Sequence, residues 1–252
     1  MRVTAISANA FDGSSVKKVI LPNTIESIGS SAFSECSLLQ EINIPDSVKQ
    51  IGEKAFYNCA SLKTINKITN IQAVSAQVFS GCSSLREITF GPSLDSIGSS
   101  AFEGCTSLQK VVLDEGVTAI GDAAFDNCIS LTDITLPKTL TRLGTAVFRH
   151  AESLQVIEIP SLVTAIPNVA FQYCTALNSI VLPKNVINIG ASAFSYCTSL
   201  QSAEIRGNIE TFGNSAFYEC TALTAIYYGS KTEDSVVNRD NYIFYNAGTA
   251  ES

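Results

Sequence analysis

Apolar residues recur along this chain at fixed distances from a phenylalanine that returns every 23 residues. The phenylalanines that keep this period are Phe33, Phe56, Phe79, Phe102, Phe125, Phe148, Phe171, Phe194 and Phe217. A leucine stands six residues after each of them, and an aliphatic residue or alanine stands nine residues after. Because a fixed period in the twenties is typical of a short unit stacked on copies of itself, the pattern predicts a solenoid.

Each unit divides into a strand and a turning segment. Apolar and polar residues alternate around the ninth position, as in Ile42-Asn43-Ile44, and this period of two predicts a strand with one buried face. A proline such as Pro45 often follows, and it ends the strand because it has no N–H group. A V-x-x-I-G stretch comes next, in which the glycine suits a corner with positive φ. We expect a short helical or 3-10 turn around the closing Ala-Phe pair, with its ring pointing inward.

The repeat sets the domain organisation. Residues 1–230 are predicted to form one elongated solenoid of about ten turns, nine of them with the full period. Phe11 heads an earlier copy that is one residue short. Residues 231–252 lose the pattern, and we expect a C-terminal cap and polar tail there. The chain starts part-way through a repeat without a signal-peptide core, so we expect either a piece trimmed from a longer protein or an intracellular protein.

Composition and charge narrow the classes of partner. Apolar residues make up 46% of the chain and charged residues 15%, which is enough apolar material for a continuous core. The formal net charge is −7, and the lysines and arginines are scattered. Because phosphate binding needs clustered basic residues, we expect no nucleic-acid partner. No stretch of 18 apolar residues occurs, so no membrane span is predicted.

The cysteines form the second most regular column of the repeat. All eight stand three residues after a repeat phenylalanine, at Cys36, Cys59, Cys82, Cys105, Cys128, Cys174, Cys197 and Cys220. Without a close cysteine pair, and with a single histidine, the spacing does not suit a metal site. Stacking brings equivalent Cα atoms within disulfide range, but parallel side chains keep the Cβ atoms apart. We therefore expect a column of buried thiols, with Ala151 in one slot.

Candidate catalytic chemistry is absent from the sequence. His150 is expected to be a solvated loop residue beside Arg149, and no base or nucleophile is placed with it. The chain has no phosphate-binding loop, nucleophile elbow or zinc-protease motif. We expect no enzymatic activity, no catalytic residues, no metal and no cofactor.

The outward face of the predicted strand is the best candidate for ligand binding. Residues eight and ten positions after each phenylalanine flank the buried aliphatic and are expected to face solvent. Valines there suggest an apolar strip rimmed by carboxylates, which a partner could bury, although valine also suits strands as such. The candidate ligand-binding residues are Lys110, Val112, Asp133, Val156, Glu158, Val181, Glu204 and Tyr227. A loop tyrosine set is a second candidate, and its members are Tyr57, Tyr173, Tyr196 and Tyr218.

The string from Pro45 to Leu62, with its P-x-x-V-x-x-I-G-x-x-A-F-x-x-C pattern, resembles the BspA-like leucine-rich repeat family. The resemblance covers about nine-tenths of the chain. It implies an α/β-type repeat solenoid: a right-handed leucine-rich-repeat superhelix with a parallel β-sheet on the concave face and short turns or 3-10 segments on the convex side. Two copies depart from the pattern, one at Lys67 and Ser75 and the other at Ala151 and Pro167.

The resemblance also implies a function. Members of the family are typically surface-exposed or secreted, several are linked to adhesion, and none brings catalytic residues to carry over. We therefore expect a monomeric, non-catalytic module of an extracellular or cell-surface protein that binds a protein or glycan through its concave face. Two alternatives stay open: a cytoplasmic protein–protein interaction scaffold, and a repeat spacer within a larger surface protein.

Overall fold

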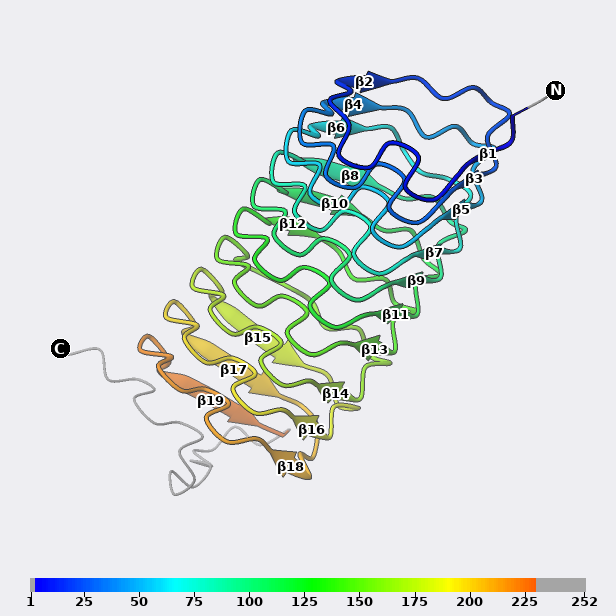
Figure 1. Ribbon diagram of the computed structural model, residues 1–252. Coiled ribbons are helices and arrows are strands. Elements are labelled where there is room, and N and C mark those ends of the chain that lie inside the picture. Colours follow the sequence, from blue (N-terminus) through cyan, green and yellow to red (C-terminus); the bar gives the residue numbers. More distant parts are fainter. Residues whose placement is uncertain (1–2, 230–252) are drawn as a thin grey trace.

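The chain forms a β-solenoid of about ten coils, built from short parallel strands (Figure 1). The computed structural model describes residues 3–229, so the cap and tail predicted for residues 231–252 lie outside the described part. Strands run in two rows along the length of the stack, one on each side. The second row is a feature that the sequence pattern did not predict.

The front strand row contains the strands predicted around the ninth position of each unit. Its members are β2 (Lys18–Val19), β4 (Glu41–Ile42), β6 (Thr64–Ile65), β8 (Glu87–Thr89), β10 (Lys110–Val112), β12 (Asp133–Ile134), β15 (Ser179–Leu182), β17 (Ser202–Ile205) and β19 (Ala225–Tyr228). Neighbouring strands pair in parallel with a register of one repeat, as Val111 does with Ile88 and with Ile134.

The second strand row lies in the V-x-x-I stretch. It comprises β1 (Ala5–Ile6), β3 (Ser27–Ile28), β5 (Gln50–Ile51), β7 (Ala73–Val74), β9 (Ser96–Ile97), β11 (Ala119–Ile120), β13 (Arg142–Leu143), β14 (Ala165–Ile166), β16 (Asn188–Ile189) and β18 (Thr211–Phe212). These two-residue strands also pair in parallel, one repeat apart. Each coil thus has two flat sides, and both bury their aliphatic residues inward.

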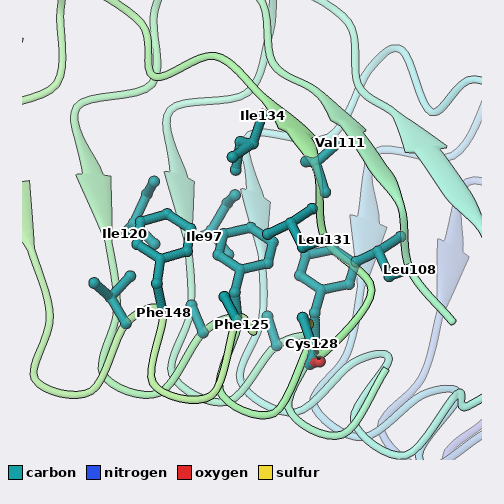
Figure 2. Packing of buried hydrophobic residues seen from close by; sticks show 14 of the residues in the cluster. Ile97, Leu108, Val111, Ile120, Phe125, Cys128, Leu131, Ile134 and Phe148 are labelled. Atoms are coloured by element: carbon teal, nitrogen blue, oxygen red, sulfur yellow. Dashed lines mark hydrogen bonds between the residues drawn. The ribbon is translucent and has the colours of Figure 1, made fainter. Parts of the chain in front are cut away.

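A stack of phenylalanine rings fills the space between the two rows. Figure 2 shows Phe125 and Phe148 between Ile97 and Ile120 on one side and Leu131 and Ile134 on the other. The nine phenylalanines from Phe33 to Phe217 are fully buried. Successive ring centroids lie 5.0–5.5 Å apart with nearly parallel planes, which confirms the predicted spine. Phe11 continues the stack at its N-terminal end, although its side chain is 41% exposed.

The segment around each Ala-Phe pair is a run of turns, and the expected helical or 3-10 turn is wrong. No residue between 3 and 229 lies in an α-helix or a 3-10 helix. The residues two before and two after each phenylalanine adopt positive φ, as Ser31 (52°) and Glu35 (56°) do around Phe33, and a right-handed helix cannot contain them. The N–H groups of these residues and of the phenylalanine donate to the next coil, as in Phe33 N to Ala55 O at 2.8 Å.

The glycine of the I-G step has a different role from the one predicted. Gly29, Gly52, Gly98, Gly121, Gly144, Gly190 and Gly213 do not adopt positive φ. A Cβ at Gly52 would lie 2.8 Å from the carbonyl carbon of Gly29 in the preceding coil. Glycine is present because two backbones approach closely at this corner, and a side chain would hold them apart.

The cysteine column is buried and reduced, as predicted. All eight thiols are free and buried. Each Sγ donates to the carbonyl oxygen of the phenylalanine in the preceding copy, as in Cys105 Sγ to Phe79 O at 3.1 Å. The thiol therefore joins two coils as well as filling space. Ala151 lacks this donor but is equally buried.

Both strand rows are interrupted at the two copies that depart from the repeat. Hydrogen-bonded pairing stops between β6 and β8 and between β5 and β7, and again between β12 and β15 and between β13 and β14. At the first break Lys67 points to solvent, and Ile68 takes the buried position beside Phe90. At the second, the segment 155–159 contains no strand. The backbone hydrogen bonds between the turn segments of successive coils form a turn ladder. This ladder continues across both breaks, through Phe56 N to Val78 O and Phe148 N to Ala170 O.

Candidate functional site

The front strand row presents the predicted columns to solvent. Along β15, Ser179 and Val181 are exposed whereas Ile180 and Leu182 are buried. The same alternation holds at β10, where Lys110 is exposed, Val111 is buried and Val112 is half-buried. The predicted orientation of residues eight and ten after each phenylalanine is therefore confirmed for these strands.

Lys110 and Asp133 form an ion pair on this face. Lys110 Nζ lies 2.8 Å from Asp133 Oδ2, and the two residues are direct neighbours in the β10–β12 register. The hydrogen bond and the charge of Asp133 raise the pKa of Lys110. An equivalent pair joins Lys18 and Glu41 at 2.9 Å, at the N-terminal end of the same column. Both pairs are exposed, so their main effect is to neutralise charge on the face and not to stabilise the fold.

Val181, Glu204 and Tyr227 are brought together by the register of β15, β17 and β19. Val181 is 37% exposed and Tyr227 55% exposed. Glu204 lies between them and so interrupts the apolar strip, instead of standing at its rim. Its carboxylate accepts two hydrogen bonds from Arg206, at 2.7 and 3.2 Å. This pairing lowers the pKa of Glu204, so the carboxylate stays ionised next to two apolar side chains.

Val156 and Glu158 belong to the coil without a front strand. Val156 is 66% exposed, the most exposed of the candidate apolar residues, and Glu158 is also exposed. Val112 stands apart from this group, on β10, where its direct neighbour in the register is Thr89. Val156, Val181 and Tyr227 therefore lie together in the C-terminal half of the row. A further exposed apolar side chain, Ile20, stands at its N-terminal end, level with Asn43 in the register.

The loop tyrosines form part of an aromatic ladder on the turn segment. The rings of His150 and Tyr173 stack at 4.4 Å, and those of Tyr173 and Tyr196 stack at 4.6 Å. Tyr218 meets Tyr196 edge-on at 5.3 Å. Tyr57 stands apart, with Lys54 Nζ 5.8 Å from its ring centroid. His150 is thus packed against an aromatic ring, whereas the sequence predicted a solvated loop residue. The 23-residue spacing of His150, Tyr173 and Tyr196 is the signal that could have revealed the stack.

Other kinds of site receive no support in the described part of the chain. Among residues 3–229, no group of three or more His, Cys, Asp or Glu side chains is arranged to hold a metal ion. Within the same residues, no helix has the length and apolar character needed to cross a membrane.

Comparison with solved structures finds the same fold in bacterial repeat proteins. A leucine-rich repeat protein from Bacteroides ovatus is 25% identical over 89% of this chain and 70% of its own length, with a TM-score of 0.61. A leucine-rich repeat protein of T. pallidum is 22% identical over 87% of this chain and 82% of its own length, with a TM-score of 0.53. No curated protein matches the chain.

The sequence pattern of one repeat family matches nearly the whole chain. The BspA type leucine rich repeat region matches residues 4–132 and 118–250, in 6 copies. This agrees with the 23-residue unit and with the parallel strands of the structure. The family consists of non-catalytic repeat proteins. The chain belongs to the BspA type leucine-rich repeat family.

Proposed function

We propose that this chain is a non-catalytic binding module of a cell-surface or secreted protein, and that it takes part in adhesion by binding a protein or glycan through the front strand row. The right-handed superhelix, with this row on its concave side, is part of the proposal. The observation that carries it is the set of exposed apolar side chains Val156, Val181 and Tyr227 in the C-terminal half of a sheet face whose other outward side chains are mainly charged or polar. A partner that buried them would gain about 25 cal/mol for each Å² of apolar surface removed from water.

The charges on this face also suit a binding surface. Asp133 and Glu204 are each held by a basic side chain on the same face. Charges that are already paired cost less to bring into an interface than isolated ones, because each keeps its partner when water leaves. An interaction scaffold inside the cell and a repeat spacer remain the alternatives, and the experiments below separate them.

The test of the binding face is the double variant Val156→Asp/Val181→Asp. We expect its affinity for an immobilised matrix protein, chosen from fibronectin, laminin and collagen, to fall at least about tenfold, which corresponds to about 1.4 kcal/mol. Surface plasmon resonance gives the affinity. Val3→Asp is the matched control, because Val3 is a valine about as exposed as Val156 and precedes β1 in the second row.

Two results would contradict the proposal. Unchanged affinity of the double variant would show that the front row is not the binding face. A large drop in melting temperature would show that these valines stabilise the core, since exposed substitutions normally change stability by less than about 0.5 kcal/mol.

Protease treatment of intact cells tests location: a surface protein is cleaved, whereas an intracellular scaffold is protected. A surface protein that binds none of the three matrix proteins would favour the spacer.

A further inference from the structure

A groove of about 610 Å³ lies in the turn segment, away from the front strand row. It is lined by residues at the first and second positions after the repeat phenylalanines, together with Gln77. Its volume falls in the range of ligand-binding clefts, about 300–1,000 Å³. It extends from the copy of Phe56 to that of Phe148, which is four repeat steps of about 5 Å each, or about 20 Å.

The groove exists because two successive copies lack a side chain at the second position after phenylalanine. Gly81 and Gly104 occupy this position, with φ of 75° and 72°. The adjoining copies carry Asn58 and Asn127 there, with φ of 53° and 58°. The backbone is left-handed at all four positions, with or without a side chain. The floor is open at Gly104, where a Cβ would meet nothing closer than 3.9 Å, whereas the side-chain oxygen of Asn58 covers Gly81.

The polar groups around the floor are held in place by their own contacts. Asp126 is only 3% exposed and accepts hydrogen bonds from Arg149 Nε, at 3.0 Å, and from Arg149 Nη2. This pair fixes the guanidinium at one end of the groove. The other N–H groups of Arg149 make no hydrogen bond to Asp126. His150, beside Arg149, is packed against Tyr173. Tyr57 stands at the opposite end.

We propose that this groove binds a neutral oligosaccharide. Arg149, Asn127 and Gln77 offer donors, and Glu103 and the two amides offer acceptors, which matches hydroxyl groups that both donate and accept. An apolar ligand would displace water from these groups and leave them without hydrogen-bond partners, which disfavours it. The charge of Arg149 is already neutralised by Asp126, and Glu103 adds a negative charge, so an anionic ligand is disfavoured.

The backbone of the groove argues against an extended peptide as the ligand. A peptide that adds a strand needs unpaired N–H and C=O groups along an edge. Here the N–H groups of Gly81 and Gly104 donate to Glu103 O and Asp126 O in the following copies, at 2.8 and 2.9 Å. The backbone N–H groups along the groove floor are therefore already hydrogen-bonded, and a ligand must be recognised by the side chains around it. The proposal is independent of the front-row function, because the two surfaces share no residue.

The test fills the groove without disturbing the turn. Gly104→Asn places in the open floor the side chain that Asn58 and Asn127 carry at the same repeat position, where φ is also positive, and a Cβ there meets nothing closer than 3.9 Å. Gly13→Asn is the matched control: Gly13 occupies the same repeat position with φ of 66°, and a Cβ there meets nothing within 4 Å. Isothermal titration calorimetry measures binding of gluco-, manno-, galacto- and xylo-configured tetra- to hexasaccharides.

We expect at least one of these neutral oligosaccharides to bind, and Gly104→Asn to weaken that binding at least about tenfold. Gly13→Asn and Val181→Asp should bind within about twofold of the unmodified chain, so that loss of front-row binding and loss of groove binding are told apart. If Gly104→Asn proves unstable, Glu103→Gln keeps the volume and is expected to weaken binding about tenfold by removing a charged acceptor. Lack of binding to every neutral oligosaccharide, preference for a heparin tetrasaccharide or a tetrapeptide, or unchanged binding by Gly104→Asn would each overturn the proposal.

Discussion

Each cysteine of the repeat combines a packing role with a hydrogen bond between coils. Cys59 Sγ donates to Phe33 O at 3.0 Å, and the same bond recurs down the column. Burial raises the pKa of Cys105 to about 12, and burial followed by the neighbouring thiols raises those of Cys82 and Cys128 well above their ordinary range. These thiols therefore keep their protons in the folded state, and the S–H donor is preserved.

This predicts that the protein loses stability at alkaline pH. In the unfolded chain the thiols lose their protons near pH 8.5, whereas Cys105 keeps its proton until about pH 12 when folded. Above pH 8.5 the unfolded state binds fewer protons than the folded state. The stability that the protonated thiols contribute is therefore complete below pH 8.5 and is lost as the pH rises towards 12. The expected slope is about 1.4 kcal/mol per pH unit for each thiol. Urea unfolding between about pH 8 and pH 10 measures it.

Cys105→Ala is the control for the alkaline loss. The free energy of unfolding of this variant should fall less steeply with pH, by about 1.4 kcal/mol per pH unit. Its stability at neutral pH should fall by about 1–2 kcal/mol, because packing and a hydrogen bond are lost. If the free energy of unfolding fell equally steeply with pH in both proteins, burial would not be what keeps the Cys105 thiol protonated.

At the scale of the element, the coil turns on two kinds of corner that the sequence does not distinguish. Left-handed residues flank each phenylalanine and are mostly not glycine, as with Lys54 and Asn58 around Phe56. The glycines of the I-G step have ordinary φ but approach the preceding coil. At Gly144, a Cβ would overlap the backbone of Gly121 and Asp122. The departing copies carry Ser75 and Pro167 at this corner, and both are the copies where the strand rows break.

Gly144→Ala is therefore expected to destabilise the solenoid. The added methyl group must push two coils apart, which costs about 1–3 kcal/mol. Ser75→Ala is the matched control: this corner already accommodates a Cβ, so the variant loses only the hydrogen bond from Ser75 Oγ to Ile51 O, at 2.7 Å, worth about 1 kcal/mol. Chemical denaturation of both variants measures the difference. A Gly144→Ala protein as stable as the parent would show that the close approach is not required.

At the scale of the whole molecule, the solenoid consists of three hydrogen-bonded blocks of strands joined by a continuous turn ladder. The breaks fall at the copies of Lys67 and of Val156. The phenylalanine stack crosses both breaks, with 5.4 Å between Phe56 and Phe79 and 5.5 Å between Phe148 and Phe171. The core is thus continuous, while the strand rows are weakest at two defined levels.

Hydrogen exchange should report the second break directly. Amides of the segment 155–159, which has no strand, are expected to exchange at least about tenfold faster than those of Ser202–Ile205 in β17, which is paired on both sides, because unpaired amides exchange without an opening step of the sheet. Exchange mass spectrometry of the native protein resolves the two segments. Equal protection would mean that the strand ladder continues through the Val156 copy in solution.

The sequence by itself determined the repeat, the inward column of phenylalanines, the buried thiols and the outward positions of the front row, because a period fixes which side chains meet when copies stack. Its two irregular copies also marked where the rows break. Tertiary structure decided what depends on the path of the backbone: the second strand row, the left-handed corners and the close approach at the glycines. It also decided which outward residues combine, since Glu204 between Val181 and Tyr227, and Gly81 beside Gly104, gain their meaning only from side chains 23 residues away.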